Sequence, residues 1–122
     1  MNTSALGPAS AVARLGFGIG LLARPGLLTR AWIGEDADRV GAQVLTRAVG
    51  IRDLVIGAGT LASAEPDRRR WLAAALAADA TDLLVTLTAG AALPLRGRVL
   101  VSLAAGGGVA MGAAALAARP AS

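Results

Sequence analysis

Six ionisable side chains lie inside long apolar stretches of this 122-residue chain, and they balance by sign. They are three arginines and three aspartates, namely Arg14, Arg47, Arg52, Asp53, Asp79 and Asp82. A charge at the centre of a bilayer costs about 2.5 to 3.5 kcal/mol on insertion scales, so such residues face a bundle interior, pair with one another and mark function. These six residues therefore define the candidate site.

The residue types restrict the chemistry of this site. The chain has no Cys and no His, which removes thiolate and imidazole ligands, thiol nucleophiles and imidazole bases, so we expect no metal and no cofactor. Asp79 and Asp82 repeat at i and i+3 on one helix face, close enough to repel each other. We interpret this pair as candidate catalytic proton donors.

The remaining four charges are candidates for ligand binding or ion pairing. Arg47 and Arg52 are permanent cations with forked donors that suit a carboxylate, a phosphate or a developing oxyanion. Arg14 is the only charge in its apolar segment. We expect Asp53 to be held by an arginine and to stay ionised.

The apolar segments predict an all-α fold, an integral membrane antiparallel four-helix bundle, with residues 1–122 forming a single transmembrane domain. The predicted spans are 6–23, 39–64, 70–93 and 98–118, near the length of about 20 residues that crosses a bilayer. Residues 27–33 predict a short interfacial helix. A soluble Ala-rich bundle would need a polar stripe on each helix, and after Arg98 the last span has Ser102 as its only polar residue.

Counting along the second and third spans places four of the charges at one depth. Two antiparallel helices that leave one turn reach equal depth after equal numbers of residues. Measured from the turn at Asp67, Asp53 lies 14 residues before it and Asp79 lies 12 after it, while Arg52 and Asp82 are each 15 away. We therefore expect one layer near the midplane, in which Arg52 meets either the carboxylate of Asp82 or a residue on another helix.

Helical periodicity assigns faces to these spans. Arg47, Gly50 and Gly57 share one face of the second span, which predicts close packing at the two glycines and a polar seam against the third span. Arg14 enters from the side of the termini and is expected within reach of Asp79. The site is therefore predicted between the second and third spans.

The net charge and the positions of the arginines indicate which kinds of partner to expect. The net charge of +4 and the pI near 11.5 would suit nucleic acid, but the arginines are spread over turns without an aromatic stacking platform, so we expect no nucleic-acid partner. The expected partners are membrane lipids and a hydrophobic small-molecule ligand, with a second copy of the chain as a further candidate. The Arg68–Arg70 run indicates a cytoplasmic location for both termini.

The run from Arg47 to Gly57, RAVGIRDLVIG, resembles the R-x-x-G-x-R-D-L-x-x-G signature of small four-helix membrane proteins of the DUF4267 type, common in actinobacteria. The pattern Asp79-Ala-Thr-Asp82 resembles the acidic third helix of that family. The resemblance implies a multi-pass membrane protein without an assigned reaction. It gives importance to Gly50, Arg52 and Asp53, as well as to Arg47 and Asp82.

Three functions are compatible with this pattern. The first is binding of a small or lipid-like ligand at the buried site, which the excess of charges over a single pair favours. The second is a membrane-embedded acid-base enzyme, an isomerase or cyclase of a hydrophobic substrate, with Asp79 or Asp82 as proton donor. The third is a structural membrane component in which ion pairs fix the helix registry.

Overall fold

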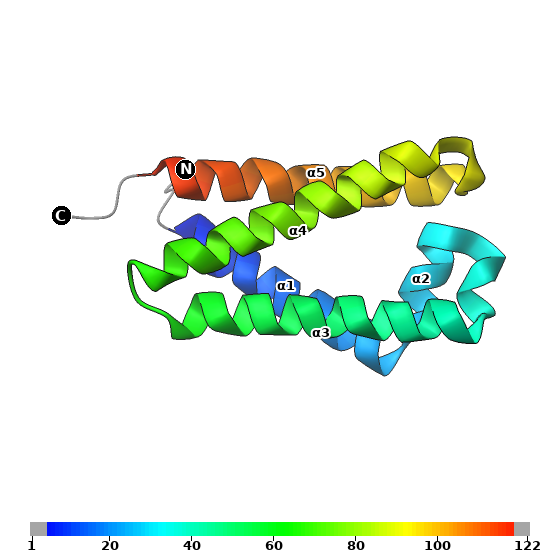
Figure 1. Cartoon of the computed structure of the whole chain (residues 1–122), viewed down its shortest axis with the longest axis horizontal. Helices are drawn as coiled ribbons and strands as arrows, with labels where there is room; N and C mark the ends of the chain where they lie inside the picture. The colour runs from blue at the N-terminus through cyan, green and yellow to red at the C-terminus, as the bar shows by residue number, and fades with distance from the viewer. Residues whose placement is uncertain (1–4, 119–122) are drawn as a thin grey trace.

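The computed structural model describes residues 5–118 and is built from helices, with no strand in that range (Figure 1). The elements in chain order are α1 (Leu6–Ala23), α2 (Pro25–Ile33), the 3-10 helix η2 (Gly34–Asp38), α3 (Val40–Ala62), α4 (Asp67–Ala89), the 3-10 turn η3 (Gly90–Ala92) and α5 (Leu95–Ala117). The expected all-α class is confirmed. The four long helices overlap the four predicted spans, although only three of them are long and apolar enough to cross a membrane.

The long helices associate as two pairs. Helix α1 packs mainly on α3, and α4 packs mainly on α5, while the two pairs meet more loosely through α3–α4 and α1–α5 contacts. Successive long helices run antiparallel, so the start of α1 and the end of α5 lie at one end of the molecule (Figure 1). The short helix α2 lies at the opposite end, where it contacts α5.

Proline and glycine set the limits of α2. Pro25 occupies its first turn, where the missing N–H removes no helical hydrogen bond. Gly34 ends it with φ +73°, in the region that favours glycine. At Gly97 a Cβ atom would collide with the carbonyl oxygen of Trp32, so α2 and α5 approach closely only because this position has no side chain. Helix α2 thereby closes one end of the bundle.

The distribution of side chains is the reverse of that in a soluble bundle. Helices α1, α4 (with η3) and α5 are long and apolar enough to cross a membrane, yet only 11% of the most apolar stretch of α5 and 17% of that of α4 is buried. Large apolar residues point outward, as Leu103 does at 71% exposure. The buried polar residues are Arg14, Thr29, Thr46, Asp53, Thr60 and Thr86. Small and apolar residues such as Ala11, Ile56 and Ala75 are buried with them. An apolar outer surface around an interior that includes charged and polar residues is the pattern of a bundle solvated by lipid.

Helix α3 does not belong to the apolar class, because it contains three charged residues, Arg47, Arg52 and Asp53. Its 23 residues nevertheless extend about 35 Å at 1.5 Å per residue, which exceeds the hydrocarbon thickness of a bilayer. The length of α3 therefore permits a membrane crossing. Its charged residues then need partners inside the bundle.

The glycine face of α3 packs on α1. A Cβ atom at Gly18 would lie 2.7 Å from the backbone oxygen of Gly50, and one at Gly57 would lie 2.9 Å from Cγ of Leu15. Gly50 and Gly57 are therefore close-packing positions, but the expectation that they face the third apolar segment is wrong. The physical reason is that α1 presents a glycine of its own at Gly18, so the two backbones can approach each other.

Candidate functional site

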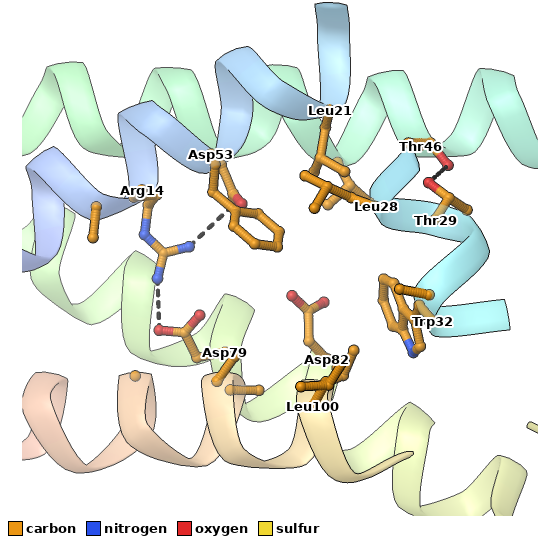
Figure 2. Close-up of a pocket in the computed structure, with 18 of the residues that line it drawn as sticks. Arg14, Leu21, Leu28, Thr29, Trp32, Thr46, Asp53, Asp79, Asp82 and Leu100 are labelled. Atoms are coloured by element: carbon orange, nitrogen blue, oxygen red, sulfur yellow. Dashed lines mark hydrogen bonds and ion pairs between the residues drawn. The ribbon is translucent and has the colours of Figure 1, made fainter. Parts of the chain in front are cut away.

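Arg14 lies at the centre of a buried ion-pair network that joins three helices (Figure 2). Its Nη1 donates a hydrogen bond to Oδ1 of Asp53 on α3 at 3.0 Å, and its Nη2 donates one to Oδ2 of Asp79 on α4 at 2.6 Å. The Arg14 side chain is 8% exposed. Charge-assisted bonds of this length are among the stronger polar interactions in proteins, so Arg14 couples α1 to both neighbours.

Arg52 extends the network on the α3–α4 side. Its Nη1 and Nη2 donate to the two oxygens of Asp82 at 2.9 and 2.7 Å, a bidentate pair. Its Nε and Nη2 also donate to Oδ1 of Asp53 at 3.2 and 3.1 Å. Both arginines therefore share one carboxylate oxygen, and the order is Asp79, Arg14, Asp53, Arg52, Asp82.

Two expected pairings are confirmed, Arg14 with Asp79 and Arg52 with Asp82. The expectation that the site lies between the second and third apolar segments holds for the Arg52–Asp82 pair but is incomplete, because Arg14 comes from α1. Helical periodicity gives the face on which a side chain lies, but it does not say which neighbour meets that face.

Arg47 does not join the network, contrary to expectation. It is exposed and forms no hydrogen bond or ion pair with any residue from 5 to 118. The buried face of α3 contains Thr46, Gly50 and Asp53, and Arg47 is turned about 100° from Thr46. The network therefore contains two guanidinium groups and three carboxylates. The equal numbers of arginines and aspartates noted in the sequence do not hold within it.

Helix α5 leaves room for the Asp79 carboxylate. A Cβ atom at Gly108 would overlap the carboxylate of Asp79, whereas one at the adjacent Gly107 would meet nothing within 4 Å. The absence of a side chain at Gly108 thus permits the rotamer of Asp79 that reaches Arg14.

We expect Gly108→Ala to lower the free energy of unfolding by about 1 to 3 kcal/mol, since the added methyl group displaces a short side chain that is fixed by an ion pair. Gly107→Ala is the matched control and is expected to cost nothing. Unfolding of the two variants by sodium dodecyl sulfate in mixed micelles measures the difference. Equal stability of the two variants would contradict this packing.

A cavity of about 790 Å³ adjoins the network and lies between the two helix pairs, with α2 at one end. Its charged lining residues are Arg14, Asp53, Asp79 and Asp82. The rest of the wall is largely apolar and includes Phe17, Leu21, Leu28, Trp32, Leu45, Val49, Leu100, Val101 and Met111. The carboxylates of Asp79 and Asp82 point into this space (Figure 2). The site is thus a pocket with one ionic end and apolar walls.

Two polar contacts hold α2 in the cavity wall, and neither follows from the sequence pattern. The hydroxyl groups of Thr29 and Thr46 are hydrogen bonded at 2.8 Å. The indole Nε1 of Trp32 donates to Oγ1 of Thr86 at 3.2 Å. The only sequence signal was a polar residue inside an apolar helix at each position, which does not identify the partner.

No family model, curated protein or solved structure matches this chain. The resemblance at residues 47–57 therefore rests on the motif residues themselves. Gly50 and Gly57 take part in helix packing, and Arg52 and Asp53 take part in the ion-pair network. Arg47 does not.

The two candidate proton donors, Asp79 and Asp82, differ in how many of their carboxylate oxygens accept a hydrogen bond. Both oxygens of Asp82 accept hydrogen bonds from Arg52. Asp79 uses Oδ2 for Arg14, and its Oδ1 accepts no hydrogen bond from the described residues. Of the pair, Asp79 alone keeps an oxygen without a hydrogen bond from residues 5–118. Across residues 5–118 no three carboxylates are grouped so that they could hold a metal ion.

Proposed function

We propose that this chain is a multi-pass membrane protein of the DUF4267 type that binds a small or lipid-like ligand in the cavity beside Arg14. In this proposal α1, α3, α4 and α5 cross the bilayer, α2 lies in the interface and both termini are cytoplasmic. The observation that carries it is the cavity of about 790 Å³ in a bundle whose outer surface is apolar. Ligand pockets typically measure about 300 to 1,000 Å³.

The position of the cavity mouth supports a hydrophobic ligand. Phe17, Leu45 and Leu100 line the cavity and are also 50%, 68% and 50% exposed. A pocket whose walls continue into the outer apolar surface opens sideways from the bundle. In a bilayer such an opening faces acyl chains, so a ligand with an apolar portion can enter without crossing water.

Two neighbouring glycines on α5 provide a test of this site. Gly107 lines the cavity, Gly106 does not, and a Cβ atom at either position would meet nothing within 4 Å. We expect Gly107→Leu to fill part of the cavity and to remove most of the co-purifying ligand, whereas Gly106→Leu leaves it bound. Native mass spectrometry of the purified proteins measures the mass and occupancy of that ligand.

Equal occupancy in Gly107→Leu and Gly106→Leu would contradict the proposed site. Finding no bound molecule on the unmodified chain in several non-ionic detergents would contradict the proposed function itself. Thermal unfolding of both variants controls for folding, since the first added carbon meets no atom within 4 Å at either position.

A further inference from the structure

We infer that the ligand's polar end is a protonated amine, so that the cavity takes an alkylammonium amphiphile with one positive charge and an apolar chain. This inference deepens the proposed function and rests on it. It follows from the charge of the network, from its free acceptor atoms and from the rest of the cavity wall.

With its three carboxylates ionised, the network has an excess of one negative charge. Its two guanidinium groups face three carboxylates, and Arg14 is the only basic residue that lines the cavity. An uncompensated charge is costly in a low-dielectric interior. A monovalent cation bound in the cavity would compensate the third carboxylate.

Two carboxylate oxygens are free to accept hydrogen bonds from such a cation. Asp53 has a side chain that is only 7% exposed, and its Oδ2 accepts no hydrogen bond from residues 5–118, because both arginines bind Oδ1. Oδ1 of Asp79 is free in the same sense. Both residues line the cavity, and neither oxygen is sealed from it. An ammonium group offers the N–H donors that these atoms lack.

The structure favours a cation over an anionic ligand, although Arg47 and Arg52 have the forked donors that suit a carboxylate or phosphate. All three nitrogens of Arg52 already donate to carboxylates. Nη1 and Nη2 of Arg14 do so too, and Arg47 does not line the cavity. An added anion would also be repelled by the three carboxylates of the network.

The remaining wall suits an organic cation. The described carboxylates are not grouped to hold a metal ion. Phe17 and Trp32, two of the chain's three aromatic residues, line the cavity, and aromatic faces attract cations as well as alkyl chains. The rest of the wall is mostly aliphatic, which fits the chain of an amphiphile.

Probes of equal chain length test the charge directly. We expect native mass spectrometry of the unmodified protein, in a non-ionic detergent with equal mole fractions of dodecylamine, dodecanol and dodecanoate, to show dodecylamine retained about 10- to 100-fold more than dodecanol. That ratio corresponds to one charge-assisted hydrogen bond. Dodecanoate is expected to bind least. Phosphatidylethanolamine, an amine that also carries a phosphate, is expected to bind less than dodecylamine.

Asp79→Asn makes the network neutral and is expected to reduce dodecylamine retention to that of dodecanol. Asp67→Asn, which alters an exposed ion pair with Arg70, is the matched control and keeps the preference. Equal retention of dodecylamine and dodecanol by the unmodified chain, or stronger retention of dodecanoate or of phosphatidylethanolamine, would overturn the inference while leaving a lipid-like ligand in place. Retention of none of the probes would contradict the proposed function as well. The order in which the unmodified chain retains the probes tests the inference even if a variant fails to fold.

Discussion

Arg14→Gln is expected to lower the free energy of unfolding by about 3 to 5 kcal/mol, because it leaves the Asp79 carboxylate without its cation and takes one of two arginines from Asp53. Among the described residues Arg14 alone links Asp53 to Asp79, and the two side chains are only 7% and 14% exposed. A domain with a stability of about 5 to 15 kcal/mol would lose a large part of it. The midpoint of unfolding by sodium dodecyl sulfate in mixed micelles, together with the yield of monodisperse protein, measures the loss.

Arg47→Gln is the matched control for that substitution. It removes the same charge from an exposed position that has no ion pair among the described residues, and we expect a change within about 0.5 kcal/mol. Arg14→Lys keeps the charge but loses the forked donor, so it is expected to fall between wild type and Arg14→Gln. Similar losses for Arg14→Gln and Arg47→Gln would contradict the central position of Arg14.

Gly18→Leu is expected to cost about 3 kcal/mol and to separate α1 from α3. The first added carbon would already lie 2.7 Å from the backbone oxygen of Gly50. Backbone atoms within two packed helices cannot move aside singly, so the helices themselves must shift. Because Arg14 on α1 reaches Asp53 on α3 across this interface, the shift would also weaken the network. The same unfolding titration measures the cost.

Gly16 lies on the same helix and provides the control, since a Cβ atom there would meet nothing within 4 Å. We expect Gly16→Leu to unfold at the wild-type midpoint. A loss of stability at Gly16 as large as that at Gly18 would show that glycine content, and not the α1–α3 contact, determines the effect.

The depth of the charged layer could be predicted from the sequence, because it depends only on helix rise and on one turn. Counting outward from Asp67 placed Arg52 level with Asp82, and the structure joins them by a bidentate pair. The reach of a long arginine side chain likewise predicted the contact of Arg14 with Asp79. Rise per residue is a local property that packing alters little.

Which helices meet could not be predicted, because it depends on the shapes of surfaces distant in sequence. Gly50 was expected to face the third span and instead packs on Gly18 of α1. Arg47 shares an approximate face with Gly50, but a turn of about 60° between the two positions is enough to place one outside and the other inside. The contact of Trp32 with Thr86 likewise joins two segments that no periodic pattern relates.

The most direct test of the account is the depth of a spin label at residue 51 on α3. The chain has no Cys, so Ile51→Cys, at an outward-facing position beside Arg52 that is 51% exposed, can be labelled singly and reconstituted in lipid. We predict that dissolved oxygen broadens its signal more than a water-soluble nickel chelate does, with the reverse for Val40→Cys at the start of α3. Stronger broadening of the residue 51 signal by the nickel chelate would contradict a charged network held inside the membrane.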